Sequence, residues 1–218
     1  SYKRMNESNG KMALQSEDTQ ERLLEVGRRL FSERGFAGTS IRDLTRAADA
    51  NLGAVTYHFG SKEGLYHAVL ERCFAPVRER IARLGQLPVP APERLELFVR
   101  GMFQHLKENP DLPRFMVQEI VLGEVPSPQI LESIRTVVGT LSRILKDGQK
   151  EGTVVPGDTV LMALSALSQP IYLTIMPQIL KREGLREAGL PLPRMSAENH
   201  GVAFLRRGLL SEERDDES

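Results

Sequence analysis

The sequence predicts an all-α protein, with a small amino-terminal domain of short helices followed by a larger carboxy-terminal helical bundle. Apolar residues recur at the spacing of one helix face along most of the 218 residues. No segment shows the apolar–polar alternation of a half-buried strand, and glycine- and proline-rich stretches such as residues 85–92 divide the chain into segments. We expect about nine helices in total.

The amino-terminal block shows four helix starts. Each is marked by a side chain that can accept a hydrogen bond from the free backbone N–H groups of a first turn. Gly35 ends the first of these helices, because glycine readily adopts the left-handed conformation that follows a last helical turn. In chain order, the capping residues are Asp18 or Thr19, Thr39 or Ser40, Asn51, and Ser61.

The carboxy-terminal block is predicted to hold longer helices. Their apolar positions recur at helical spacing, and proline, glycine or polar clusters separate them. The expected helices cover residues 92–108, 112–122, 127–150, 158–181 and 196–210, with a loop over 184–194.

Composition is that of a soluble globular protein, with 40% hydrophobic and 27% charged residues. A single cysteine, Cys73, excludes an internal disulfide and fits a reducing cytosol, so a cytoplasmic protein is expected. No basic-then-apolar signal segment opens the sequence. Residues 160–180 are the longest apolar region, but Ser165, Ser168 and Pro170 interrupt it, so we expect no membrane span.

The formal net charge of zero hides an asymmetry along the chain. Residues 211–218 hold five acids and one arginine, a net charge of −4, which leaves +4 on residues 1–210. A nucleic-acid-binding protein is expected to be basic somewhere. The charge balance permits a DNA partner without indicating one.

The segment from Thr39 to Lys62, TSIRDLTRAADANLGAVTYHFGSK, reads as two short helices joined by a tight turn, with a further helix beginning at its end. The second of these helices, residues 51–59, carries Gly, Ala, Thr, Tyr and His where a core helix would carry leucines. A helix so short and so poor in core-forming side chains has little stability of its own. The pattern predicts a helix-turn-helix, whose second helix is placed in the DNA major groove.

Residues 20–72 resemble the amino-terminal domain of the TetR family of transcriptional repressors, through TSIRDL, NLGAVTYHFGSKEGLY and the helix before them. The resemblance implies a homodimeric repressor that a small-molecule effector releases from a palindromic operator on double-stranded DNA. The expected organisation is a disordered arm or cloning remnant over 1–16, a helix-turn-helix domain over 17–64, a helical ligand-binding and dimerisation domain over 65–210, and an acidic tail over 211–218.

Two positions depart from the family pattern. Asp49 stands in the turn where a glycine is usual, and Ala50 replaces a larger aliphatic residue. Aspartate tolerates the left-handed conformation better than most residues, so we expect the turn to form.

The predicted DNA-binding surface lies on the outer side of these helices. Leu52 and the Thr56 methyl group can lie against thymine methyl groups, and Lys62 is expected to clamp a phosphate. The resemblance implies that Tyr57 and His58 hold phosphates. The full predicted set is Thr39, Ser40, Arg42, Asn51, Leu52, Gly53, Ala54, Thr56, Tyr57, His58 and Lys62.

Several of these residues have an equally simple structural interpretation. Thr39 and Ser40 can be plain helix caps, His58 can pack between helices, and Arg42 and Lys62 can be solvated.

The resemblance also implies a dimer interface on the last two long helices. The first of them is apolar nearly all round, so it needs cover on more than one side. An ordinary intrachain core is the alternative. The last helix is expected to contribute Val202, Phe204, Leu205 and Leu209.

An effector pocket is implied by the family, and its chemistry is not fixed by the sequence. Large adaptable side chains near polar groups are the candidates, although such stripes are also typical of a core. The candidate ligand-binding residues are Phe103, Phe115, Met116, Glu119, Tyr172 and Met176, with His105 and Gln118 as polar neighbours.

Two other function classes remain open. An enzyme is disfavoured, because the four histidines lack metal-ligand spacing and no phosphate loop or nucleophile elbow is present. No cofactor and no metal are therefore expected. The other alternative is a helical dimer that binds protein without specific DNA recognition.

Overall fold

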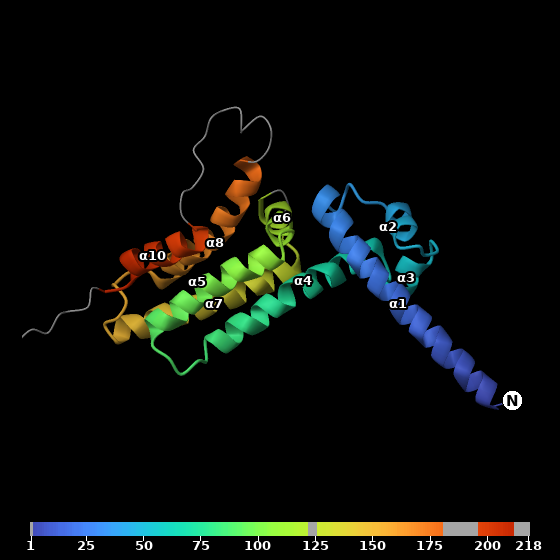
Figure 1. Ribbon diagram of the computed structural model, residues 1–218, viewed down its shortest axis with the longest axis horizontal. Helices are drawn as coiled ribbons and strands as arrows, with labels where there is room; N and C mark the ends of the chain where they lie inside the picture. The colour runs from blue at the N-terminus through green and yellow to red at the C-terminus, as the bar shows by residue number, and fades with distance from the viewer. Residues whose placement is uncertain (1, 122–125, 181–195, 212–218) are drawn as a thin grey trace, which may run out of the picture. The chain divides into compact units, whose positions relative to one another are not determined.

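The computed structural model describes residues 2–121, 126–180 and 196–211. Across these residues there are nine α-helices, one π-helical turn and no strand, so the predicted all-α class is confirmed. The chain divides into two compact units (Figure 1). The first comprises Ser1–Phe74 and Arg114–Ile130, and the second Ala75–Pro113 and Leu131–Ser218.

The sequence placed the domain boundary at residue 64, whereas the first unit runs to Phe74 and takes in residues 114–130 as well. The reason is packing on α4. The ring of Tyr66, on α4, packs against the rings of Phe31 from α1 and Phe115 from α6, with centroid distances of 5.0 and 6.4 Å. A segment distant in sequence therefore joins the first unit.

Three helices form the centre of the first unit, and each packs against the other two. Their apolar residues meet in a core in which Leu23, Phe31, Leu44, Val55 and Leu65 are fully buried. The elements of this unit are α1 (Tyr2–Arg34), α2 (Ile41–Ala47), α3 (Ala54–Phe59), the first part of α4 (Lys62–Leu84), the end of α6 (Leu112–Met116) and the π-helix η1 (Val117–Val121).

Helix α1 begins at Tyr2, not at residue 18 or 19 as the capping pattern predicted. The expected disordered arm over residues 1–16 is therefore helical from residue 2 onward. This stretch holds the good helix formers Lys, Met, Glu, Ala, Leu and Gln and no proline, and its one glycine, Gly10, costs about 1 kcal/mol without ending the helix.

The second unit is a helical bundle in which α5, α8 and α10 pack against one another. Ion pairs fix α10 to α5 through Arg100 with Glu198 and through Arg206 with Glu96. The helices of this unit are the second part of α4, α5 (Ala91–Glu108), α7 (Pro128–Lys150), α8 (Thr159–Leu180) and α10 (Ala197–Leu209).

The helices predicted for the carboxy-terminal block agree with these bounds to within a residue or two, except that the helix predicted over 112–122 is α-helical to Met116 and π-helical from Val117. The predicted loop over 184–194 and residues 212–218 of the predicted tail lie outside the described residues.

Helix α8 corrects the expectation that this region is too polar for a membrane span. Thr159–Met176 is long and apolar enough to cross a membrane by length and composition, and 17% of this window is buried within the chain. The interrupting serines do not prevent this, because Ser165 Oγ donates to the Leu161 carbonyl and Ser168 Oγ donates to the Ser165 carbonyl. An apolar helix that leaves Leu161, Leu164 and Tyr172 exposed needs a partner surface.

Candidate nucleic-acid interface

The turn between α2 and α3 forms as the sequence predicted. Asp49 adopts φ 50°, and among the described residues it is the one non-glycine residue with positive φ. The backbone of the turn is closed by Ala48 N–H to Leu44 O at 3.0 Å and Ala50 N–H to Thr45 O at 2.9 Å. The turn thus holds the strained residue in place through backbone bonds on both sides of it.

The start of α2 is capped by Ser40 in a reciprocal arrangement. The Asp43 backbone N–H donates to Ser40 Oγ at 3.1 Å, and the Asp43 carboxylate accepts hydrogen bonds from the Ser40 hydroxyl and backbone N–H. These hydrogen bonds from Ser40 lower the pKa of Asp43. Ser40 is therefore the cap, and its hydroxyl is already engaged in the protein.

Thr39 does not lie on the surface, contrary to the prediction. It is buried, and its hydroxyl donates to the carbonyls of Leu30 and Gly35, at 3.3 and 2.9 Å. Its side chain ties the end of α1 to the start of α2. The sequence could not separate Thr39 from Ser40 because both residues are good caps.

Helix α3 has a buried inner face and an exposed outer face. Val55 is fully buried, whereas Tyr57 is 80% exposed and Leu52, just before the helix, is 59% exposed. Thr56 is also exposed. A six-residue helix that leaves its largest side chain in solvent is held by its inner face and presents the other.

Ala54 corrects the predicted outer face. It is 5% exposed, and its methyl group lies with Val55 on the buried side of α3. The helix was expected to begin at Asn51 with that side chain as its cap. Instead Gly53 is the N-cap with no side-chain hydrogen bond, and the Asn51 carbonyl accepts from Ala54 N–H at 3.0 Å. Asn51, Leu52 and Gly53 are thus exposed turn residues ahead of the helix.

Lys62 has a structural role that the sequence did not reveal. Its Nζ donates to the carbonyls of Phe36 and Thr39, at 2.9 and 3.0 Å, and lies 4.1 Å from the centroid of the Phe36 ring. An ammonium group has three N–H donors, so two are used to hold the loop between α1 and α2. A phosphate could receive the third.

The remaining predicted contact residues lie beside this surface. Arg42 is exposed on α2. His58 is half-buried between the rings of Tyr57 and Phe59, with centroids at 4.9 and 6.1 Å, which supports a packing role for the imidazole.

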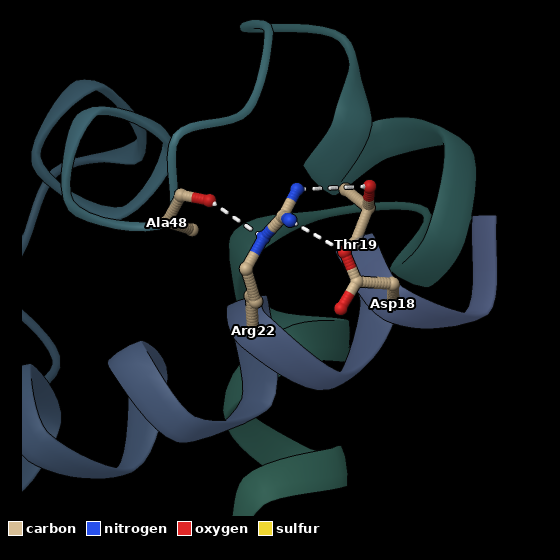
Figure 2. Close-up of polar contacts among 4 residues, drawn as sticks. All are labelled: Asp18, Thr19, Arg22 and Ala48. Carbon is tan, nitrogen blue, oxygen red and sulfur yellow. Dashed lines mark hydrogen bonds and ion pairs between the residues drawn. The ribbon is translucent and has the colours of Figure 1, made fainter. Parts of the chain in front are cut away.

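Arg22 is a residue of this region that sequence reasoning missed. Its guanidinium reaches from α1 to the end of α2, where Nε donates to the Ala48 carbonyl at 3.0 Å (Figure 2). Asp18 and Thr19, one turn earlier on α1, accept from its terminal nitrogens. The i,i+4 spacing of Asp18 and Arg22 was readable in the sequence, but the contact with Ala48 was not.

The predicted effector-binding residues divide between the two units. Phe115, Met116 and Glu119 belong to the first unit, and Phe103, Tyr172 and Met176 to the second.

In the first unit, Glu119 is committed to structural hydrogen bonds. Its carboxylate accepts from the Tyr66 hydroxyl at 2.6 Å and from the Ser127 backbone N–H at 2.7 Å. Burial and, second, the bond to Glu119 raise the pKa of Tyr66. Phe115 is fully buried in the same cluster. These groups pack α6 and η1 against α4, so they are core and not a pocket lining.

In the second unit, Phe103 is buried beneath α10. A Cβ atom built on Gly201 would stand 2.7 Å from its ring, so the glycine is needed for this close helix approach. Tyr172 lies in the open, 59% exposed. The sequence could not distinguish core from pocket here, because both use the same side chains at the same spacing.

The residues of α10 that were predicted for the dimer interface differ in exposure. Val202 and Leu205 are buried within the chain, whereas Phe204 is 51% exposed. The first two therefore belong to the intrachain core.

Among the described residues, no group of three His, Cys, Asp or Glu side chains is placed to hold a metal ion.

The geometry defines a helix-turn-helix protein, with a short second helix whose outer face is open. A sequence model described as bacterial regulatory proteins, tetR family, matches residues 23–69. Residues 23–69 are therefore a helix-turn-helix DNA-binding domain of the TetR family of transcriptional regulators.

Individual relatives agree with this assignment. The chain is 28% identical over 134 residues to the HTH-type transcriptional repressor DhaR of Mycobacterium sp. (strain GP1), covering 61% of this chain and 68% of that protein. It is 25% identical over 190 residues to the HTH-type transcriptional regulator UidR of Escherichia coli (strain K12), covering 82% of this chain and 92% of that protein.

Solved structures share the fold at low sequence identity. SmeT, the repressor of the Stenotrophomonas maltophilia multidrug efflux pump SmeDEF, aligns with a TM-score of 0.66 at 18% identity, over 90% of this chain and 94% of that one. AibR, solved in complex with isovaleryl coenzyme A and operator DNA, aligns with a TM-score of 0.66 at 17% identity, over 87% and 97%.

Proposed function

We propose that this protein is a sequence-specific repressor, acting in the cytoplasm as a homodimer on a palindromic operator and released from it by a small molecule. The observation that carries the proposal is the division of α3 into a buried inner face and an open outer face. Tyr57, Leu52 and Thr56 are exposed there while Val55 is fully buried.

The chemistry of the exposed side chains suits a duplex. Leu52 and the Thr56 methyl group can contact thymine methyl groups, and the Thr56 hydroxyl can donate to or accept from a base edge. The Tyr57 hydroxyl, Arg42 and the free donor of Lys62 are suited to phosphates, which fix the position of the protein on DNA. No arginine or glutamine lies on the outer face of α3, so apolar contacts and DNA shape should carry much of the selectivity.

The uncovered face of α8 supports a dimer. Leu161 is 63% exposed, and Leu164, Ser165, Ser168 and Tyr172 continue the same face at helical spacing. Two leucines and a tyrosine exposed along one helix face, with small serines between them, mark an interaction surface. Phe204 on α10 is a further candidate for it. Two copies paired here would present two α3 helices to half-sites about one turn of DNA apart.

Effector release does not rest on the predicted ligand-binding residues, which divide between core positions and surface positions. It rests on the family, and on AibR, whose structure holds both a coenzyme A ester and operator DNA. The mechanism we propose is a ligand in the second unit that favours a conformer whose α3 helices no longer match their half-sites.

Selection of bound duplexes from a random pool tests the proposal. We expect a palindromic consensus, with affinity that falls steeply as salt rises from about 50 to 200 mM, because bound phosphates release counterions. Recovery of no consensus, together with salt-independent association with protein partners, would favour the protein-binding alternative. Adding candidate small molecules to the selected complex then tests release.

A further inference from the structure

The guanidinium of Arg22 joins α1 to the turn that precedes the recognition helix (Figure 2). Nε donates to the Ala48 carbonyl at 3.0 Å, and Nη2 donates to Thr19 Oγ1 at 3.3 Å. The other terminal nitrogen, Nη1, is paired with the Asp18 carboxylate. Asp18 and Thr19 therefore hold the guanidinium in the orientation that points Nε at the Ala48 carbonyl.

The accepting carbonyl lies at the point where the chain leaves α2. Ala48 is the C-cap of α2, with ψ 0°, and Asp49 follows in the left-handed conformation. This conformation carries a steric cost for a residue with a Cβ atom. A charge-assisted hydrogen bond to the preceding carbonyl fixes the plane of the Ala48–Asp49 peptide and opposes that cost.

This peptide plane determines where the chain goes next. Residues 50–53 follow without regular structure, and α3 begins at Ala54 with no side-chain cap of its own. The direction of so short a helix is therefore set by the turn before it and by its buried inner face. A change in the orientation of the Ala48 carbonyl would redirect the outer face of α3.

We infer that Arg22 is a positioning residue for DNA recognition: it holds the Ala48 carbonyl, and through it the strained turn at Asp49, so that α3 meets the base edges in register. The inference rests on the proposed function. Arg22 acts through the turn and is not required to touch DNA itself.

Two neutral substitutions separate this role from a charge effect. In glutamine the amide nitrogen stands the same number of bonds from Cα as Nε does in arginine, so Arg22→Gln can still donate to the Ala48 carbonyl. Arg22→Met has a stem of similar length and no donor. Both variants lose the same charge and the contacts with Asp18 and Thr19.

The measurement is the affinity of the full chain for a selected operator and for a random duplex over a range of salt. We expect Arg22→Met to bind the operator about tenfold more weakly than Arg22→Gln, with equal affinity for the random duplex and equal salt slopes. Equal operator affinities of the two variants would overturn the inference. The inference would also be overturned if both variants lost affinity equally for the operator and the random duplex relative to wild type, with a salt slope lower by about one. That result is the signature of a lost phosphate contact.

Asp49→Gly provides a rescue, because glycine adopts φ 50° without the steric cost. In the Arg22→Met background, this change should restore several-fold of the lost operator affinity if the arginine supports the turn. No recovery would count against the inference.

Arg72→Met is the matched control. Arg72 is paired with Glu21 in the same unit, and its side chain is 47% exposed against 41% for Arg22. The Arg72→Met variant should leave unchanged the ratio of the affinity for the operator to the affinity for the random duplex. A wild-type chain that binds no duplex would refute the proposed function and the inference together, whereas a binding wild type with equal Met and Gln variants would refute the inference alone.

Discussion

Helix α3 and helix α8 both leave large side chains in solvent, but they do so in different ways. On α3 the open face belongs to a six-residue helix, and it mixes a hydroxyl, a phenol and a single leucine just before the helix. On α8 it runs along a 22-residue helix, where Leu161, Leu164 and Tyr172 are the large side chains and two serines lie between them.

The difference indicates the kind of partner each face needs. A mixed polar and apolar face with backbone close to the surface at Gly53 suits base edges and phosphates, which require hydrogen bonds as well as van der Waals contact. On α8 the serine hydroxyls are already bonded to their own helix, so the exposed leucines and tyrosine leave water best against another apolar face. We therefore assign DNA to α3 and a second copy of the chain to α8.

Leu164→Arg should have the largest effect on dimerisation and operator affinity, because it puts a charge into the proposed dimer interface. We expect a monomer by sedimentation, and operator affinity lower by at least about a hundredfold, since each copy then holds one half-site. Leu131→Arg is the control, because Leu131 is similarly exposed but lies on α7. A Leu164→Arg chain that stays dimeric would move the interface elsewhere.

Tyr57→Ala should act on the other face and leave the dimer intact. The side chain is 80% exposed, so its loss should not change the unfolding midpoint. Operator affinity, measured by fluorescence anisotropy, should fall about ten- to thirtyfold if ring and hydroxyl both contact the duplex. Unchanged affinity would remove Tyr57 from the interface.

Lys62→Met sharpens the comparison by testing what supports the α3 side of the molecule. Loss of the hydrogen bonds to the Phe36 and Thr39 carbonyls should reduce the free energy of unfolding by about 1–2 kcal/mol. Urea unfolding measures this, with Lys146→Met, at an exposed position on α7, as control. Equal stability of the two variants would show that the hydrogen bonds add nothing, and a phosphate would be the main partner of Lys62.

Thr56→Val should have the smallest effect, about two- to fivefold on operator affinity. It keeps a methyl group and loses the hydroxyl, so selection of bound duplexes should show altered preference at one or two base pairs. A uniform loss at all positions would mean that Thr56 positions the helix and reads no base.

The sequence predicted those features that depend on local chain chemistry. Helix bounds in the second unit, the left-handed Gly35 and the left-handed Asp49 follow from periodicity and backbone preference. Features that depend on which surfaces meet could not be read in this way. Lys62 and Arg22 find backbone carbonyls 26 residues away in the chain, and no local pattern specifies such a contact.

The predicted effector residues show the same limit. Phe103 and Phe115 are core residues of two different units. Their spacing is that of any amphipathic helix, so only packing decides whether they line a cavity. Ala54 was misplaced because it neighbours the inward-facing Val55, and a small side chain does not reveal which side of so short a helix it takes.

Photo-crosslinking from the two open faces tests the assignment most directly. A photoreactive phenylalanine analogue replaces Tyr57 in one sample and Tyr172 in another, and each is irradiated with a selected duplex. The account predicts that position 57 links to DNA and position 172 to a second copy of the chain. A duplex linked from position 172, or left unlinked from position 57, would contradict it.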